Sequence, residues 1–430
     1  MSERQSVLKG IEIPKDWNLE AVANLTLEHK QGYYTKDAYV DEGMYLIRIT
    51  DLHNPKISFE DMPQVYIDKK TYEQFKVEEN DFLFARSGAI GRYGIYKGEY
   101  PKAIFASYLI RFKFNAEKIN NRYFGYFYES YLAQKQLGSI TQGSSNININ
   151  ANNIKSLVVP LPAISEQKKI ASILSSVDEA IEKTEAIIKQ IEKVKKGLMQ
   201  QLLSKGIRHN SFKDTEIGDI PCEWNLGTLK NYSEHITKGA TPTTYGFDWV
   251  EEGVLFLRNE CVKETGLSLK GSSFISEEAH IAMKRSIIKL GDILITITGN
   301  LGQCCIYDKG PQEANINQHI ARIRIIDNTL NPQFVRYFLN SNFMRKKYDL
   351  IKTGLAYPQL SLKQIQDIVI PIPSIEEQQQ IVSILSSFEK KIEVEQLSLI
   401  QLQNLKKGLM QSLLTGKVRV KVDEAEVTQV

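Results

Sequence analysis

The densest group of side chains able to contact a nucleic acid lies between Arg86 and Lys113. This segment holds six cationic residues and one acid, Glu99, with four tyrosines interleaved. Cations contact phosphates and tyrosines stack or hydrogen-bond in a groove, so the pattern favours nucleic-acid binding. An ordinary solvated strand surface would explain any one of these residues equally well. The predicted contacts from this segment are Arg86, Ser87, Arg92, Tyr93, Lys97 and Arg111.

A second group, between residues 258 and 322, is rich in amide and guanidinium side chains instead. Arginine, asparagine and glutamine are the residues that read base edges in the DNA major groove through paired hydrogen bonds. The sequence therefore predicts a second reading surface with different chemistry. Its predicted members are Arg258, Asn259, Thr298, Asn300, Gln303, Gln318 and Arg322.

Catalytic signatures are weak throughout the sequence. The stretch "NPQF" at 331–334 resembles the N-P-P-F motif of adenine methyltransferases but lacks one proline, and its counterpart in the first half reads "NRYF". In "GLSLKGSS" the lysine precedes the second glycine, which favours a turn over a P-loop. The six histidines are scattered, and no Ser-His-Asp or paired-carboxylate pattern repeats between the halves. We expect a non-catalytic chain that binds no cofactor and no metal of its own.

The composition sets broad limits. The chain has 430 residues, 42% apolar and 24% charged, which is enough for at least two domains, and a net charge of +3 does not argue for nucleic acid. No apolar run approaches the roughly 18 residues of a membrane span and the N-terminus lacks a signal peptide, so we expect a cytoplasmic protein. The four cysteines have no metal-ligand spacing, and we expect buried, reduced thiols.

The sequence contains an internal duplication that must position both groups of residues. "VVPLPAISEQKKIASILSS" from Val158 recurs as "VIPIPSIEEQQQIVSILSS" from Val369, 211 positions later. The same shift maps "KKGLMQQLL" onto "KKGLMQSLL" and "DFLFARSGAIGRYGIY" onto "DILITITGNLGQCCIY". Each half is therefore a variable globular unit followed by a nearly constant segment.

The constant segments predict two long helices. Residues 165–203 and 376–414 contain no proline and one glycine each, so each helix would be about 58 Å long. A 4-3 apolar spacing runs along both, as in coiled coils, and predicts that the two helices pair antiparallel. Two separate helices that each cap their own domain are the alternative. The predicted seam is Ile170, Leu174, Val177, Ile181, Ile188, Ile191, Leu198, Leu202, Ile381, Leu385, Phe388, Ile392, Leu399, Leu402, Leu409 and Leu413.

The globular segments mix short strand-like runs with helical stretches near 117–137 and 331–351. Glycine-bounded turns between the runs favour a mixed α/β unit with a largely antiparallel sheet over a doubly wound parallel sheet. The predicted fold class is thus α/β (α+β), with two recognition domains separated by two paired helices. The predicted division is 1–160, first domain; 161–206, first helix; 207–371, second domain; 372–416, second helix; 417–430, tail.

The doubled helix starts, the "KKGLMQ" helix ends and the "GDIL" and G-x-x-G elements resemble the DNA-specificity subunit of type I restriction–modification systems along nearly the whole chain. The resemblance implies that each domain reads one half of a bipartite double-stranded DNA site. It implies that the helices set the spacer and dock two modification (methyltransferase) subunits, with restriction subunits as further partners. Methylation and ATP-driven cleavage, with S-adenosylmethionine, ATP and Mg, would belong to those partners.

Two other functions remain open from the sequence. A coiled-coil scaffold with no role in DNA binding would make the basic and amide-rich loops incidental. A single-chain restriction–methyltransferase would need a methyltransferase domain of a few hundred residues, and no segment of the chain is left to hold one.

Overall fold

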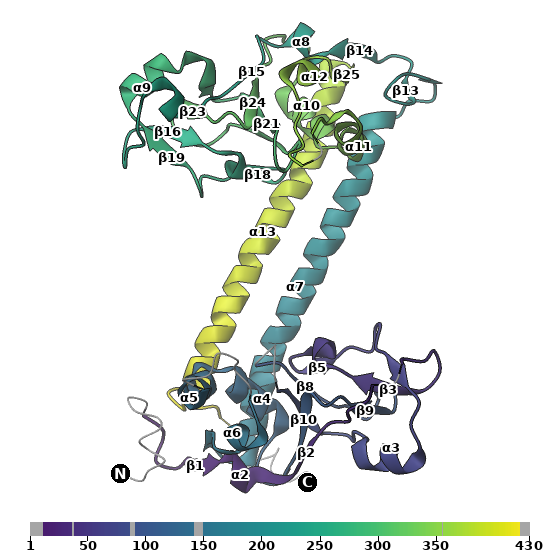
Figure 1. The fold of residues 1–430 in the computed structure, drawn as a ribbon, viewed down its shortest axis with the longest axis vertical. Helices are drawn as coiled ribbons and strands as arrows, with labels where there is room; N and C mark the ends of the chain where they lie inside the picture. The colour runs from purple at the N-terminus through teal and green to yellow at the C-terminus, as the bar shows by residue number, and fades with distance from the viewer. Residues whose placement is uncertain (1–11, 37, 87–90, 142–148, 355, 422–430) are drawn as a thin grey trace. The chain divides into compact units, whose positions relative to one another are not determined.

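The computed structural model of the chain describes residues 12–36, 38–86, 91–141, 149–354 and 356–421. The chain divides into two compact units, 1–185 with 398–430 and 186–397 (Figure 1). Both division points fall inside long helices, so each unit contains part of α7 (Ile164–Lys205) and part of α13 (Ile375–Leu413). These helix bounds confirm the two long helices that the absence of proline predicts. In the described residues no helix combines the length and apolarity needed to cross a membrane.

The first unit is a mixture of short strands and helices in which most strand pairs are antiparallel. Its main sheet has the order β2-β10-β7-β8, and a smaller sheet, β6-β3-β9, contains the parallel pair β3 and β9. Its elements before α7 are β1 Asn18–Ala21, α2 Val22–Leu25, β2 Thr26–Gln31, β3 Met44–Ile47, η1 Ile49–Asp51, β4 Leu52–His53, β5 Lys56–Ile57, β6 Gln64–Val65, α3 Lys69–Phe75, β7 Phe82–Ala85, β8 Tyr93–Ile95, β9 Ala103–Phe105, β10 Leu109–Phe114, α4 Asn121–Glu129, α5 Tyr131–Thr141, α6 Ala151–Lys155 and β11 Val158–Leu161.

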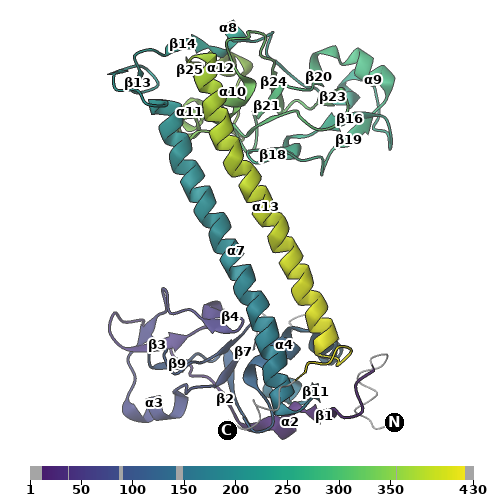
Figure 2. The same ribbon diagram turned by 180° about the vertical axis from the view of Figure 1, so that it is seen from behind.

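The second unit repeats this plan, with sheets β15-β24-β21-β22 and β19-β16-β23-β20. In both views the β16, β19 and α9 side lies away from the long helices, whereas α10 lies against them (Figures 1 and 2). Its elements are β12 Phe212–Lys213, β13 Ile220–Pro221, β14 Asn225–Thr228, α8 Leu229–Tyr232, β15 Thr237–Lys238, η2 Pro242–Tyr245, β16 Val254–Leu257, η3 Asn259–Cys261, β17 Val262–Lys263, β18 Gly266–Leu267, β19 Ser273–Ile275, α9 Glu277–Ala282, η4 Lys284–Ser286, β20 Ile287–Lys289, β21 Ile293–Thr296, β22 Cys304–Ile306, β23 Glu313–Ile316, β24 Ile320–Ile323, α10 Pro332–Leu339, α11 Asn342–Ile351, α12 Leu362–Gln366 and β25 Val369–Ile372.

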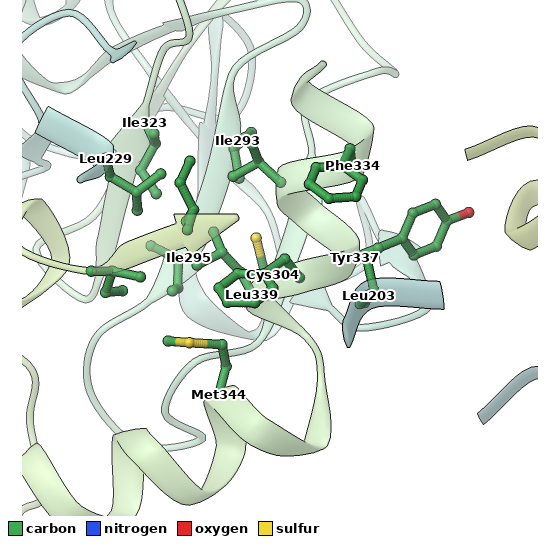
Figure 3. Packing of buried hydrophobic residues seen from close by; sticks show 14 of the residues in the cluster. Leu203, Leu229, Ile293, Ile295, Cys304, Ile323, Phe334, Tyr337, Leu339 and Met344 are labelled. Carbon is green, nitrogen blue, oxygen red and sulfur yellow. The ribbon is translucent and has the colours of Figure 1, made fainter. Parts of the chain in front are cut away.

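The core of the second unit lies between α10, α11 and the sheet that contains β21. Figure 3 shows Phe334 and Leu339 of α10, Met344 of α11 and Ile295 of β21 gathered around Cys304 of β22. All five side chains are buried. Burial of apolar surface at about 25 cal/mol per Å² is the main force that holds such a unit together. The core therefore gives β21 and β22 a rigid base for the loop that joins them.

The repeated glutamate at the start of each long helix ties that helix to its own unit. The Trp17 indole Nε1 donates to Glu166 at 3.3 Å, and the Trp224 indole donates to Glu377 at 2.9 Å. Both tryptophans are buried, and a buried N–H without its acceptor would be an unsatisfied donor. The doubled Glu-Gln motif is therefore structural, because its first residue closes the same contact in each copy.

The C-terminal segment completes the first unit. Arg419 donates to both oxygens of Glu166, at 2.8 and 2.9 Å, and pairs with Asp16 at 2.8 Å. Its guanidinium also lies 5.6 Å from the centre of the Trp17 ring. These contacts join the two ends of the described chain within one unit and raise the pKa of Arg419. The segment after α13 is thus part of the first unit's fold.

Within each unit the two long helices run antiparallel, with their apolar seam turned inward. In the first unit the start of α7 and the end of α13 share a core that includes Ile170, Leu174 and Leu413. In the second unit the end of α7 and the start of α13 share a core that includes Leu202 and Leu385. All sixteen residues predicted for the seam are buried or partly buried. This packing supports pairing of the helices over separate caps.

A lysine interrupts the seam at the same position of both copies, and each lysine reaches an acid on the other helix. Lys195 of α7 lies 2.7 Å from Glu389 of α13, and Lys406 of α13 lies 2.8 Å from Asp178 of α7. Both pairs are equivalent in the repeat, because their members are 211 positions apart. A charged residue on a coiled-coil seam specifies which partner and which register are accepted.

Two local expectations need correction, and the weakly matching "NPQF" segment has a structural role. The helical stretch predicted at 117–137 is two helices, because Ser130 has extended backbone angles between α4 and α5, and the stretch at 331–351 is likewise α10 and α11. Cys222 is exposed, whereas the other three cysteines are buried thiols. The "NPQF" asparagine, Asn331, caps α10 by accepting from the amides of Gln333 and Phe334.

Candidate nucleic-acid interface

The loop between β21 and β22 presents Asn300 to solvent on a fixed backbone. The Thr296 hydroxyl donates to the carbonyl of Asn300 and accepts from the amide of Gln303 at 3.0 Å. Gly302 has φ +73°, and a Cβ there would lie 2.2 Å from the Tyr348 ring. Only glycine fits that position. The structure therefore holds the exposed Asn300 and the half-buried Gln303 at the end of a rigid hairpin.

A chain of hydrogen bonds joins this loop to two neighbouring segments. Thr241 donates to the Gln318 Oε1 at 2.8 Å, and the Gln318 Nε2 lies 3.0 Å from Nε2 of His319. Because an amide nitrogen only donates, His319 accepts through Nε2 and donates through Nδ1 to the Thr298 hydroxyl at 2.5 Å. All four side chains are half-buried, so their remaining donors and acceptors face the surface in set orientations.

Arg258 and Asn259 lie beside this network. Arg258 lies over the Trp249 ring, 5.1 Å from its centre, and no carboxylate of the described residues forms an ion pair with it. The Asn259 amide nitrogen lies 3.5 Å from the point where a Cβ on Gly299 would stand. An arginine stacked on an indole keeps its planar set of donors available. Arg258, Asn259, Thr298, Asn300, Gln303 and Gln318 thus come together on one face of the second unit.

The first unit differs at the position equivalent to Arg258. Arg48 also precedes a short 3-10 helix, but it donates from Nε and Nη2 to Asp51 at 3.1 and 2.9 Å. This bond raises the pKa of Arg48 and holds its guanidinium in place. In the second unit Cys261 stands where Asp51 would be, which releases Arg258. The same framework therefore presents different chemistry in its two copies.

The predicted residues of the first unit lie around the end of the β7–β8 hairpin. Arg92 is exposed and Arg86 is partly buried just after β7. Asn54 holds the hairpin end, because it donates to the Gly91 carbonyl at 3.0 Å. Lys97 is exposed at the far end of β8 and pairs with Glu99 at 3.3 Å. Ser87 lies outside the described residues.

Three predicted residues are buried, and we leave them out of the interface. Tyr93 is 1% exposed, and its hydroxyl donates to Glu129 at 2.9 Å while burial raises its pKa. Arg111 and Arg322 are 5% and 8% exposed, and their Nη1 groups donate to the carbonyls of Lys76, at the end of α3, and of Ile287 in β20, at 2.7 and 2.9 Å. Their Nε groups are buried without a hydrogen-bond partner in the described part of the chain, so neither guanidinium is turned towards the reading surface.

Trp249 and Thr241 were not predicted from the sequence, and His319 was not among the predicted contacts. A lone tryptophan and a threonine carry no spacing signal of their own. The replacement of Asp51 by Cys261 is, however, visible by aligning the two halves at Arg48 and Arg258. That comparison could have shown that Arg258 lacks the carboxylate with which Arg48 pairs, and that its guanidinium needs a different neighbour.

A family model described as "Type I restriction modification DNA specificity domain" matches residues 14–193 and 221–404. The putative type I restriction enzyme MjaX specificity subunit of Methanocaldococcus jannaschii is 28% identical over 417 residues, 95% of each chain. The EcoBI specificity subunit of Escherichia coli is 24% identical over 446 residues, covering 96% of this chain and 89% of the relative.

Solved structures agree on the fold. The S subunit of a type I restriction–modification system from M. genitalium superposes with a TM-score of 0.56 at 16% identity, over 94% of this chain and 96% of that one. A chain from a study of assembly and conformational transition of the type I R-M system gives 0.59 at 16% identity, over 95% and 100%. The scaffold without a role in DNA recognition is therefore set aside. The chain belongs to the type I restriction–modification DNA-specificity family and is a DNA-recognition specificity subunit.

Proposed function

We propose that each unit reads one half of a bipartite double-stranded DNA site. The observation that carries the proposal is that one duplicated framework presents two different surfaces. The second unit offers Asn300, Gln318 and an Arg258 that forms no ion pair in the described residues, which suit base edges. The first unit offers Arg86 and Arg92, and its Arg48 is bound to Asp51. Two readers with unlike chemistry suit two unlike half-sites.

The two long helices are proposed to set the spacer and to dock two modification subunits. Each helix exposes apolar side chains on the part outside its seam, and a helix with apolar residues in water is suited to a protein partner. These exposed residues are Ile187 and Val194 on α7 and Val394, Leu397, Ile400 and Leu405 on α13. Restriction subunits would join the same assembly in the cytoplasm, where the DNA lies. The boundaries predicted from the sequence, at residues 160, 206, 371 and 416, remain a proposal for where the recognition domains and the spacer helices begin and end.

The isolated chain is expected to have no catalytic activity. Purified alone, it should neither methylate nor cut DNA, with or without S-adenosylmethionine, ATP and Mg, because the proposal assigns these cofactors and both reactions to partner subunits. Transfer of a labelled methyl group and cleavage of plasmid DNA are the measurements. The same chain mixed with its modification subunit is the positive control. Activity of the isolated chain above background would contradict the division of labour.

Single substitutions at the two surfaces are expected to affect one half-site each. Arg92→Ala or Arg86→Ala should relax recognition of the first half-site, and Asn300→Ala or Gln303→Ala that of the second. A base-edge contact contributes roughly 1–3 kcal/mol of discrimination, whereas removal of a phosphate contact weakens all sequences alike. Binding to duplexes with single changes in either half-site measures this. Lys230→Ala serves as a matched control, because Lys230 is an exposed cation paired with Asp367 at 3.0 Å and is not among the predicted contacts. Equal effects on both half-sites would show that the units do not read independently.

A further inference from the structure

A basic recess lies on the second unit, away from the proposed reading surface. It has a volume of about 520 Å³ and is lined by residues of α9, η4, β20 and β24. Figure 2 labels α9, β20 and β24. Five cationic side chains and two carboxylates line it. The cations are Lys284, Arg285, Lys289, Arg322 and Arg324, and the carboxylates are Glu234 and Glu313.

The recess is held in place by hydrogen bonds of its own lining residues. Arg324 donates from Nε and Nη2 to Asp292, both at 2.7 Å, and the Thr237 hydroxyl donates to the Arg285 carbonyl at 2.9 Å. Glu234 lies 3.5 Å from Arg322 and 2.8 Å from Arg324, so the two guanidinium groups at the back of the recess share a carboxylate. The free positive charge of the recess therefore comes from its other cations.

The two cations at the mouth are not neutralised. Lys284 and Arg285 are exposed and form no ion pair within the described part of the chain. Lys289 lies 3.1 Å from Glu313, which is shared with His280 at 3.4 Å. The recess therefore keeps an excess of positive charge after its internal pairs are counted.

The equivalent corner of the first unit shows that this excess is not a requirement of the fold. Glu78 stands where the second unit has Lys289, 211 positions earlier, and the amide of each donates to the aspartate three residues on. Glu73 of α3 lies in the same corner. Lys76 pairs with both glutamates, at 3.0 and 2.9 Å. A further lysine, Lys113, pairs with Glu78 at 2.6 Å, and together the two lysines lower the pKa of Glu78 to about 2. The first unit thus neutralises this corner itself, whereas the charge reversal at Lys289 and the unpaired Lys284 and Arg285 make the second unit's corner cationic in the described part of the chain.

We infer that the recess of the second unit binds phosphate groups, those of a DNA backbone or of a free phosphate compound. Clustered lysine and arginine side chains are the usual partners of phosphate oxygens, and arginine binds them through two parallel hydrogen bonds. Where the phosphate belongs to DNA, the inference rests on the proposed function. It adds an asymmetry, because only one of the two units would hold the backbone at this corner.

The test replaces two lysines of the recess by glutamate. In the complex with modification subunits, Lys284→Glu with Lys289→Glu should weaken binding to all duplexes alike. The slope of log affinity against log salt should fall by about one for each phosphate that the variant no longer binds, while half-site preference stays unchanged. The fold accommodates glutamate at the Lys289 position, as Glu78 of the first unit shows, and Lys284 is an exposed side chain. Lys270→Glu with Lys309→Glu makes the same charge change at exposed lysines outside the recess and should change the slope less.

A second arm separates the two sources of phosphate. Inorganic phosphate is titrated into the full chain without DNA at constant ionic strength, and the thermal midpoint is followed. A lower salt slope in the first arm identifies DNA as the source, and a phosphate-induced rise in Tm that is absent from the double variant identifies a free phosphate compound. The inference would be overturned if neither effect were observed, or if the salt slope fell equally in the control pair. A wild-type complex with no preference for any bipartite site would instead contradict the proposed function and keep the phosphate arm interpretable.

Discussion

A variant with one extra heptad in each long helix is expected to methylate the same two half-sites with about three more base pairs between them. Seven residues at a rise of 1.5 Å lengthen a helix by about 10 Å, and base pairs are spaced about 3.4 Å apart. The insertions belong after Ala186 and after Leu397, which are equivalent positions of the repeat. There they keep the pairs Lys195–Glu389 and Lys406–Asp178 intact within their units.

The seam should survive, because seven residues preserve the coiled-coil period. Three base pairs also turn B-DNA by roughly a third of its 10-base-pair repeat, so a lower affinity is expected as well. Sequencing of methylated adenines in cells that carry the variant with its partner subunits measures the spacer. A heptad inserted in α7 alone is the matched control and should abolish methylation instead of lengthening the spacer. An unchanged spacer in the double insertion would mean that the helices do not set the distance.

Glu389→Ala is expected to destabilise the second unit by about 3–5 kcal/mol, the usual effect of removing one partner from a buried ion pair. Glu389 accepts from Arg336, whose side chain is 7% exposed, from Lys195 at 2.7 Å and from the Tyr337 hydroxyl at 2.9 Å. Without the acid, two cations would share a buried site with no counter-charge. Urea unfolding of the full chain, followed at both transitions, measures the decrease in stability.

Asp178→Ala is the matched control at the equivalent position. Lys406 would keep Glu129 at 3.2 Å, so a smaller decrease in stability is expected in the first unit. Burial raises the pKa of Glu389, but Arg336 and Lys195 outweigh burial and hold the pKa below its ordinary value. The stabilisation is therefore full above the ordinary carboxyl pKa and disappears as pH falls through the lowered one. Equal destabilisation in the two variants, or a destabilisation in E389A that grows in acid, would contradict this account.

Much of the framework could be predicted because its signals are local. The 4-3 apolar spacing over 165–203 and 376–414 predicted α7 and α13 to within about two residues, since a helix face repeats along the sequence itself. Glycines around 88–91 and 299–302 likewise predicted the turn between β21 and β22, where Gly299 and Gly302 have positive φ. The duplication added the expectation that both halves share one fold. The two main sheets have matching strand orders, and the smaller sheets match except for β20, which the second unit adds.

The tertiary structure alone decided which polar residues are available to a ligand. Arg111 and Arg322 lie on strands, and both bond to a carbonyl 35 positions earlier, that of Lys76 and of Ile287. Each also pairs with an acid distant in sequence, Glu28 and Glu234. Arg258 has no carboxylate partner among the described residues because Cys261 stands three residues later, where the first unit has Asp51. The effect of that substitution depends on how the chain folds back at that point. The hydrophobic period of a helix or strand predicts the average burial of its faces and not the contacts of a single side chain. Whether one charged side chain meets a partner or solvent depends on segments distant in sequence, and no local pattern records them.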